Sequence, residues 1–301
     1  MENRIDWELW HAFLAVAEAG SLSAAARKAG VSQPTLGRQV RALEGALGIG
    51  LFRREPRGLA LTEAGRDLLE PARAMRQAAA RAELAAAGRE TGLAGTVRIT
   101  ASRIVSAHLL PPILADLRAD EPGIEIDLVP SDETENLLFR EADIAVRMYR
   151  PTQQDIVTRH LGVFGMALYA APALLERHGT PATLDALLSL PFVGFDRNDL
   201  ILRMMADLGL QRRREDFGLR CDDQLVYLHL VRAGCGVGGM PRPVGDADTS
   251  LRRVAPFVAL PSLPVWLAMP DALRANPRIR RVWDHLAGAL AARLDQAAPA
   301  R

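Results

Sequence analysis

Two short helix patterns separated by a turn of three residues constrain the fold of this chain most. The first lies over 21–30, where a serine can cap an alanine-rich helix and Gly30 can end it. In the second, Ser32 can cap the helix and Pro34 falls in its first turn, where a missing N–H breaks no hydrogen bond. A further amphipathic pattern over 7–19 precedes them. Together these patterns predict a helix-turn-helix supported by a third helix.

The exposed face of the last of these helices suits contact with DNA. Apolar residues repeat on one side of it, at Leu36, Val40, Leu43 and Leu47, and the opposite side carries Gln33, Thr35, Arg38, Gln39 and Arg41. Gln can pair with adenine and Arg with guanine, while Ser and Thr hydroxyls suit phosphate oxygens. The pattern predicts base readout in the major groove, because the second helix of such a motif enters it. Three-helix bundles that never touch DNA remain the alternative.

A short two-stranded ribbon is predicted directly after these helices. The segment 51–62 contains a Pro-Arg-Gly turn at 56–58, which can close a hairpin. Arg53, Arg54 and Arg57 lie at or beside its tip, where they can neutralise backbone phosphates. A solvated turn is the alternative for single arginines, but beside a helix-turn-helix we interpret the ribbon as a wing.

Residues 63–88 are rich in alanine, leucine, arginine and glutamate, which predicts a long helix. Its residues at heptad spacing are Leu68, Ala72, Met75, Ala79, Ala82 and Ala86. This seam predicts self-association of two copies, although alanine buries little area, and packing onto its own domain is the alternative. Pro71 inside the pattern predicts a kink or a break.

The rest of the chain alternates between strand and helix patterns. After a glycine-rich hinge at 88–95, a strand at 96–101, a helix reaching residue 119 and a strand at 124–129 predict a βαβ unit with a parallel sheet. Further strands are expected at 142–147, 165–171 and 190–195. The chain is 301 residues long, which is more than one core of ordinary size needs, so at least two domains are expected.

Ligands of such sheets bind beyond the carboxyl ends of the strands. The loops there carry Ser102, Arg103, Ser131, Asp132, Arg147, Phe195, Asp196 and Arg197. Hydroxyls beside an arginine suit a small organic anion such as a carboxylate. Structural roles stay open for each residue alone: Ser102 can simply cap its helix, and Arg147 can pair with an acid.

Composition narrows the functional class. The formal net charge is +1, so affinity for nucleic acid must come from a local patch. The N-terminus lacks an apolar signal core and no apolar stretch approaches the length of a bilayer span, so we expect a cytoplasmic protein without membrane contact. No catalytic, cofactor or metal-binding motif is present, which argues against an enzyme. Cys221 and Cys235 fit either small buried residues or a redox switch.

The N-terminal residues resemble a known family. The runs are 13–26, Val31-Ser32-Gln33-Pro34-Thr35-Leu36, Leu43-Glu44, Leu47-Gly48, Leu51-Phe52-Arg53-Arg54 and Leu61-Thr62-Glu63-Ala64-Gly65. They strongly resemble the LysR-type transcriptional regulators, densely over the first 65 residues and more loosely to the C-terminus. The resemblance departs at Gly37, where the family often has serine, so one hydroxyl contact is expected to be lost.

The resemblance implies an N-terminal all-α winged helix-turn-helix with a long linker helix, followed by an α/β two-lobed effector domain of periplasmic-binding-protein type. The implied boundaries are 1–62, 63–90 and 95–301, with a first lobe at about 95–163 and 266–301 and a second at about 164–265. By similarity, Gln33, Pro34 and Arg38 meet base edges, and Ser32, Thr35, Arg54 and Arg57 lie nearer phosphates. The implied effector pocket holds Ser102, Ser131, Arg147, Phe195 and the run 234–238, including Gly236 and Val237.

The function expected from these observations is regulation of transcription. A dimer or tetramer would bind double-stranded operator DNA, with RNA polymerase as a further partner, and a small-molecule effector would tune it through the C-terminal domain. No cofactor is expected. Two alternatives stay open: a cytoplasmic small-solute-binding protein without regulatory DNA binding, and an architectural DNA-binding protein without an effector.

Overall fold

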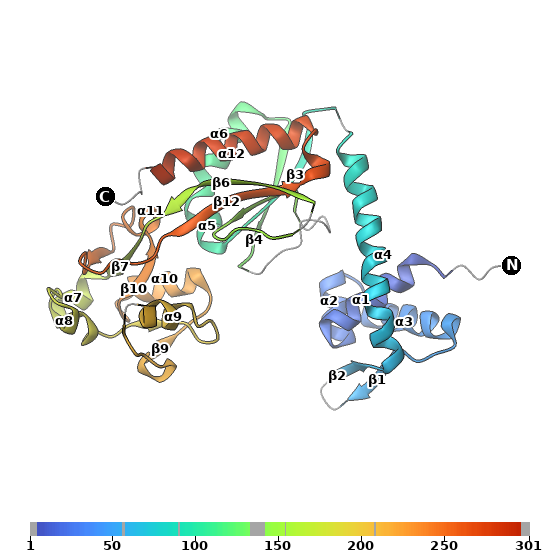
Figure 1. Cartoon of the computed structure of the whole chain (residues 1–301), viewed down its shortest axis with the longest axis horizontal. Coiled ribbons are helices and arrows are strands. Elements are labelled where there is room, and N and C mark those ends of the chain that lie inside the picture. Colours follow the sequence, from blue (N-terminus) through green and yellow to red (C-terminus); the bar gives the residue numbers. More distant parts are fainter. Residues whose placement is uncertain are drawn as a thin grey trace. The chain divides into compact units, whose positions relative to one another are not determined.

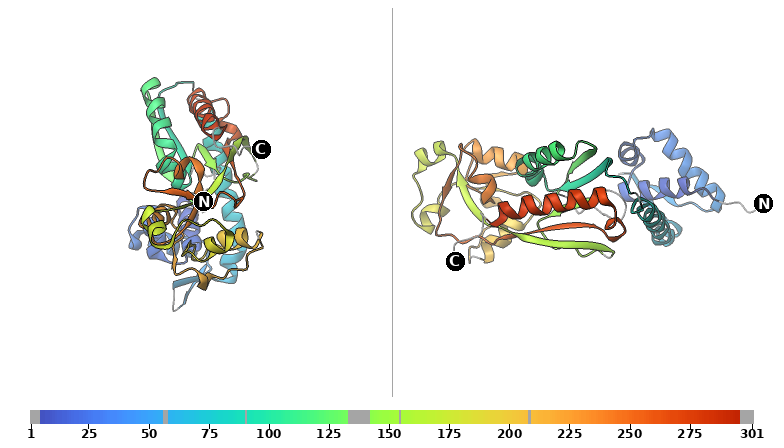
Figure 2. Two further views of the ribbon diagram at one scale, coloured as in Figure 1. Left: turned by 90° about the vertical axis from the view of Figure 1, so that its left-hand side faces the viewer. Right: turned by 90° about the horizontal axis from the view of Figure 1, so that it is seen from above.

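The chain divides into two compact units, Met1–Glu83 and Leu84–Arg301, and each is considered by itself. The computed structural model describes residues 5–55, 58–89, 91–132, 142–153, 155–207 and 209–295. Figure 1 labels the helices and strands, and Figure 2 gives two further views.

Three helices and a two-stranded ribbon make the first unit. Its elements are α1 (Trp7–Ala19), α2 (Leu22–Ala29), α3 (Gln33–Leu47), β1 (Phe52–Glu55), β2 (Gly58–Leu61) and the start of α4 (Glu63–Ala87). Ser21 caps α2 by accepting from Ala24 N–H at 3.2 Å, and Gly30 ends it with a φ of 66°. Both helices of the predicted helix-turn-helix and the helix over 7–19 are confirmed.

Helix α1 packs on both helices of the motif. Phe13 and Leu14 share one apolar cluster with Leu43 of α3 and Leu51, and Ala12 and Val16 share another with residues of α2 and α3. The α1 helix therefore fixes the angle between α2 and α3.

The ribbon is confirmed, with Phe52 opposite Leu61 and Glu55 opposite Gly58. Pro56 and Arg57 at its tip lie outside the described residues. Glu44 ties the ribbon to α3, because its Oε1 accepts from Leu51 N–H at 2.7 Å and Phe52 N–H at 3.2 Å. The ribbon base and α3 therefore move together.

Of the kink or break predicted at Pro71, the break does not occur, because helix α4 continues through this residue. Proline removes one backbone hydrogen bond, but Leu68, Leu69 and Ala72 around it pack into the apolar core of the first unit and hold the helix there. Ala72, a residue of the proposed seam, is buried by this packing, whereas Met75 is exposed.

A five-stranded sheet organises the first lobe of the second unit. Its strand order is β4-β3-β5-β12-β6, with β3 (Gly95–Ala101) parallel to β4 (Ile124–Pro130) and β5 (Ile144–Arg147). Strand β12 (Leu263–Pro270) runs antiparallel to β5 and to β6 (Ile156–Phe164). The βαβ prediction is confirmed, and the two antiparallel strands were not predicted.

Helices α6 (Leu110–Asp120) and α12 (Pro277–Asp295) lie on one face of this sheet (Figure 1). The predicted single helix reaching residue 119 is wrong: α5 (Arg103–His108) and α6 are separate and meet at Leu109. Two adjacent prolines, Pro111 and Pro112, explain the break because neither can donate the backbone hydrogen bond that a continuous helix needs. A 3-10 turn, η3 (Asp271–Leu273), leads toward α12.

The second lobe contains a three-stranded antiparallel sheet of order β10-β7-β11 and the parallel pair β8-β9. Its strands are β7 (Met166–Ala170), β8 (Val193–Gly194), β9 (Leu219–Arg220), β10 (Gly238–Pro241) and β11 (Arg252–Val254). Its helices are α7 (Pro172–His178), α8 (Leu184–Leu188), α9 (Leu200–Asp207), η2 (Arg214–Asp216), α10 (Gln224–Arg232) and α11 (Arg242–Gly245). The strand expected at 165–171 is present, and that expected at 190–195 shrinks to β8 with a single bridge from Phe192 to Val237.

Asn276 joins the end of α4 to the start of α12. Its side chain is 1% exposed, donates from Nδ2 to the Ala87 carbonyl at 2.8 Å, and accepts from Ile279 N–H at 3.1 Å. One amide thus satisfies a carbonyl at the end of one helix and an N–H in the first turn of another.

Candidate nucleic-acid interface and effector site

The exposed side of α3 carries two arginines that are available to bind an anion or a base edge. Arg38 and Arg41 are exposed, and within the described part of the chain neither makes a hydrogen bond or an ion pair. Pro34 is exposed in the first turn, and Gln39 is half-buried. The buried side consists of Leu36, Val40 and Leu43, as the periodicity predicts, while Leu47 is half-buried.

The first turn of α3 is built by its own polar side chains. Ser32 Oγ accepts from Thr35 N–H at 3.2 Å and lies 2.8 Å from Thr35 Oγ1. Ser23 Oγ donates to Gln33 Oε1 at 3.1 Å, a contact from α2 that sequence reasoning missed. This bond occupies the amide oxygen of Gln33 and leaves its NH2 group for another acceptor.

The two arginines of the ribbon differ in their surroundings. Arg53 is paired with Glu55 at 2.9 Å, whereas Arg54 is exposed without a hydrogen bond or ion pair among the described residues. Arg57 lies outside the described residues. Arg54 is therefore the better placed of the two described arginines to meet an anion, because Arg53 must first leave its partner.

Gly37 is buried, and a Cβ built on it would lie 3.7 Å from Leu22 Cδ1. A serine hydroxyl at this position would thus begin from a Cβ against α2. The departure from the family pattern affects the packing of α2 on α3 more than it affects the exposed side of α3.

In the second unit, the predicted effector residues follow three neighbouring strand ends. Ala101 of β3 is in register with Pro130 of β4 and with Val146 of β5. The next residue of each strand is Ser102, Ser131 and Arg147, so the parallel register places these residues at one edge of the sheet. Ser131 N–H bonds to the Ala101 carbonyl at 2.9 Å, which holds this edge together.

Ser102 and Arg147 are polar groups inside this edge. Ser102 is 8% exposed, makes no capping bond, and its Oγ has no hydrogen-bond partner among the described residues. Arg147 is 6% exposed and donates from Nη2 to Thr100 Oγ1 at 3.2 Å. A buried hydroxyl without a partner costs about 1–3 kcal/mol, so a bound acceptor or donor would stabilise this edge.

Arg103 connects the two lobes. Its Nη1 lies 2.8 Å from Asp223 Oδ2, at the start of α10 in the second lobe, and its backbone N–H donates to Asp132 Oδ1 at 3.1 Å. Asp223 also caps α10 by accepting from Leu225 and Val226 N–H at 3.0 Å, and these backbone hydrogen bonds hold its pKa below the usual range, together with the charge of Arg103. Sequence reasoning missed Asp223.

Phe195 begins a loop that is held in place by contacts with Tyr227 and Asp222. Its ring packs on that of Tyr227 at a centroid distance of 5.1 Å. Asp222 accepts from the backbone N–H groups of Asp196, Arg197 and Asn198 at 2.8 to 3.3 Å. Its slight burial raises the pKa of Asp222, but these hydrogen bonds outweigh that effect and lower it. Asp222 therefore fixes the loop after β8, and nothing in its sequence context marked it.

Gly236 and Val237 contact the segment that leads into β8 through their backbones. Val237 N–H donates to the Pro191 carbonyl at 2.8 Å, and its carbonyl accepts from Val193 N–H at 3.0 Å. A Cβ on Gly236 would come within 2.8 Å of the Phe192 backbone, so only glycine fits this approach. The Val237 side chain is buried among apolar residues.

The described residues give little support for a metal site, a membrane span or a disulfide. The described residues contain no group of three or more His, Cys, Asp or Glu side chains placed to hold a metal ion. None of the described helices combines the length and hydropathy needed to cross a bilayer. Cys221 and Cys235 are half-buried free thiols.

Comparisons with known proteins agree with this geometry. Residues 7–66 match the family described as bacterial regulatory helix-turn-helix protein, lysR family, and residues 90–291 match the LysR substrate binding domain. The regulator CrgA of Neisseria meningitidis is 32% identical over 82% of this chain and 83% of its own length. The Mau operon transcriptional activator of Paracoccus denitrificans is 30% identical over 92% of this chain and 94% of its own.

Among solved structures, the full-length virulence activator AphB of Vibrio cholerae has the same fold, with a TM-score of 0.65 at 20% identity over 94% of this chain and 99% of that one. The match over 7–66 favours a regulator over a solute-binding protein without a DNA-binding domain, and the family consists of regulators and not of enzymes. The chain belongs to the LysR family of transcriptional regulators, with an N-terminal helix-turn-helix DNA-binding domain and a C-terminal two-lobed effector-binding domain.

Proposed function

We propose that this regulator reads a specific double-stranded operator with α3 and responds to a small organic anion bound between the lobes. The observation that carries the first part is that Arg38 and Arg41, on the exposed side of α3, have no hydrogen-bond or ion-pair partner among the described residues. Gln33, Pro34 and Gln39 accompany them toward base edges, while Ser32, Thr35, Arg53, Arg54 and Arg57 serve the phosphates. An arginine that donates two hydrogen bonds to guanine contributes about 1–3 kcal/mol of discrimination.

The effector part is supported by the buried Ser102 hydroxyl, which has no hydrogen-bond partner in the described part of the chain and lies at the same sheet edge as the buried Arg147. Ser131 and Phe195 complete this site, and Gly236 and Val237 shape its wall through the backbone. Arg103 joins the lobes through Asp223. An anion that binds one arrangement of the lobes more tightly shifts the protein toward it, and the operator affinity changes by the same coupling.

The remaining assignments belong to this proposal as well. The domains are 1–62, 63–90 and 95–301, with the lobes divided near residues 163 and 265. Two copies associate through the exposed part of the α4 seam from Met75 onward, as a dimer or a tetramer, and the assembly works with RNA polymerase in the cytoplasm.

The test is binding of the full-length protein to fragments of its own upstream intergenic DNA. We expect Arg38→Ala to weaken binding to the preferred fragment by about 10- to 100-fold at matched salt. Arg280→Ala removes the same charge from an exposed ion pair on α12 and is expected to change binding less than twofold. If the wild type prefers no fragment over random DNA across a salt series, the proposal of sequence-specific binding is wrong.

A further inference from the structure

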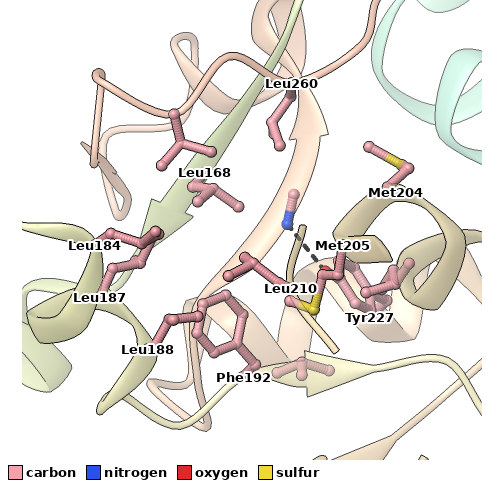
Figure 3. Close-up of a pocket in the computed structure, with 14 residues that line it drawn as sticks. Leu168, Leu184, Leu187, Leu188, Phe192, Met204, Met205, Leu210, Tyr227 and Leu260 are labelled. Carbon is pink, nitrogen blue, oxygen red and sulfur yellow. Dashed lines mark hydrogen bonds between the residues drawn. The ribbon is translucent and has the colours of Figure 1, made fainter. Parts of the chain in front are cut away.

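A cavity in the second lobe lies apart from the predicted effector site. It measures about 70 Å³, and none of Ser102, Ser131, Arg147 and Phe195 lines it. Its walls come from β7, β10, α8, α9, α10 and the segment after β11. Figure 3 shows Leu184, Leu187 and Leu188 on one side of it and Met204 and Met205 on the other.

Helix α9 forms one wall and is packed incompletely. Ile201, Met204 and Met205 line the cavity, yet none of the eight residues of α9 is buried. Protein interiors normally pack as densely as organic crystals, and atoms that face a void lose the dispersion contacts of that side. An apolar occupant would restore those contacts.

Tyr227 adds one polar group to this apolar wall. Its side chain is 3% exposed, and its hydroxyl oxygen accepts from Gly239 N–H at 3.0 Å. Within the described part of the chain, no acceptor takes the hydroxyl proton of Tyr227. Burial raises the pKa of Tyr227 to about 12, so the proton stays in place at neutral pH. The cavity therefore offers a hydrogen-bond donor that lacks an acceptor.

We propose that this cavity is a second ligand site, for an uncharged apolar molecule of up to one aromatic ring that accepts one hydrogen bond from Tyr227. Among the described residues, Tyr227 is the only ionisable side chain that lines the cavity, so a charged ligand would lose its hydration without compensation. An engineered apolar cavity of about 150 Å³ binds benzene, so a ring fits here only if a wall moves. Met204 and Met205 can supply that movement because methionine is unbranched and flexible.

The site also has a physical connection to the effector loop. The ring of Tyr227 packs on Phe195, so the same side chain lines the cavity and contacts a proposed effector residue. Coupling between the two ligands rests on the proposed effector site, whereas the cavity itself does not.

The test uses the full-length protein with acetophenone, toluene and benzylammonium as probes. The expected result is that acetophenone and toluene shift the methyl resonances of Met204 and Met205, and that benzylammonium does not. Acetophenone should bind about tenfold more tightly than toluene, because only its carbonyl accepts from Tyr227. Tyr227→Phe should remove this preference and leave toluene binding within twofold.

Two further variants show whether the neutral probes bind inside this cavity. Met204→Phe fills the cavity from a half-buried position and should weaken both neutral probes at least tenfold, whereas Met166→Phe, a half-buried methionine of β7 outside the cavity, should not. Ser102→Ala should leave acetophenone binding unchanged, which keeps the outcome independent of the effector proposal. No methyl shift at millimolar acetophenone, or a shift that persists in Met204→Phe, would overturn the proposal.

Discussion

The two binding regions of this regulator are built in opposite ways. On α3, the candidate DNA contacts are neighbours in the sequence, and Arg38 and Arg41 stand exposed on a helix whose other side is core. At the effector site, Ser102, Ser131 and Arg147 come from three different strands, and two of them are buried. Apart from Ser32 and Thr35, which also build the first turn of α3, the candidate DNA contacts are therefore separate from the residues that hold the fold, whereas the candidate effector site is built partly from buried residues.

This difference has a consequence for mutation. In the N-terminal unit, residues that hold the fold can be changed separately from Arg38 and Arg41, the proposed DNA contacts on the exposed side of α3. In the effector domain, a substitution at the site also changes the interior, so matched controls must distinguish lost binding from lost packing.

The largest effect is expected for Gly65→Ala. A Cβ on Gly65 would collide with the Leu51 carbonyl oxygen, which is backbone and cannot easily move away. We expect the free energy of unfolding of the N-terminal unit to fall by about 3 kcal/mol, as overpacking in a close-packed interior does. Chemical denaturation measures it. An unchanged denaturation midpoint would mean that the backbone near Leu51 can move to accept the added methyl group, and that the packing at the ribbon base does not limit stability.

Ser102→Ala should lower effector affinity without destabilising the unliganded protein, although Ser102 is buried. Because the hydroxyl of Ser102 has no partner among the described residues, its removal should leave the unliganded protein as stable as before or slightly more so. The affinity for the effector anion should fall by about tenfold, measured by calorimetry once an effector is found.

Ser106→Ala is the matched control for this change. Ser106 lies one turn further along α5, is equally buried, and donates to the Ala101 carbonyl at 3.2 Å. The Ser106→Ala protein should lose about 1 kcal/mol of unfolding free energy and keep the effector affinity of the wild type. The reverse pattern in the two variants would show that Ser102 has a structural role.

Glu18→Gln should produce a smaller, pH-dependent loss. Glu18 of α1 is paired with Arg76 of α4 at 2.6 Å; partial burial raises its pKa, but the hydrogen bond and charge of Arg76 outweigh burial and lower it. The pair therefore stabilises the folded state above the ordinary pKa of a glutamate, and this contribution is lost as the pH falls through the lowered value. We expect a loss of about 0.5–1 kcal/mol at pH 7, because the pair is half-exposed.

Unfolding curves of wild type and Glu18→Gln should accordingly converge in acid. Glu70→Gln, which removes a more exposed partner of Arg73, should have less effect at any pH. Equal losses in the two variants would contradict a specific role for the contact between α1 and α4.

The smallest effect is expected for Gly45→Ala. This residue lies inside α3, and a Cβ there would meet no atom within 4 Å. Alanine should raise the free energy of unfolding by about 0.5 kcal/mol, because glycine loses more backbone entropy in a helix. The affinity of the Gly45→Ala protein for operator DNA should equal that of the wild type. A lower affinity would mean that the C-terminal end of α3 contacts DNA.

Local signals account for what could be predicted from the sequence. The helix-turn-helix is marked by caps and glycines next to the residues they affect, and the parallel strands by short apolar runs between turns. The antiparallel strands β6 and β12 were missed although 263–270 is an apolar run bounded by prolines, because the partners of β12 lie more than 90 residues earlier. Pro111 and Pro112 could have predicted the end of α5, because two adjacent prolines do not fit the middle of a helix.

The candidate effector site could be predicted only in part. The strand ends marked Ser102, Ser131 and Arg147, because topology alone brings them together. Thr100, Asp222 and Asp223 act through partners 24 to 120 residues away, and no spacing rule connects them.

The Asn276 amide bears on how the effector domain can be produced alone. The family match to the substrate-binding domain begins at residue 90, but a protein truncated there lacks Ala87, whose carbonyl Asn276 binds. A truncation that starts at residue 84 retains this last turn of α4. The shorter protein should melt at a lower temperature than the longer one, although the six residues between them lie outside both lobes.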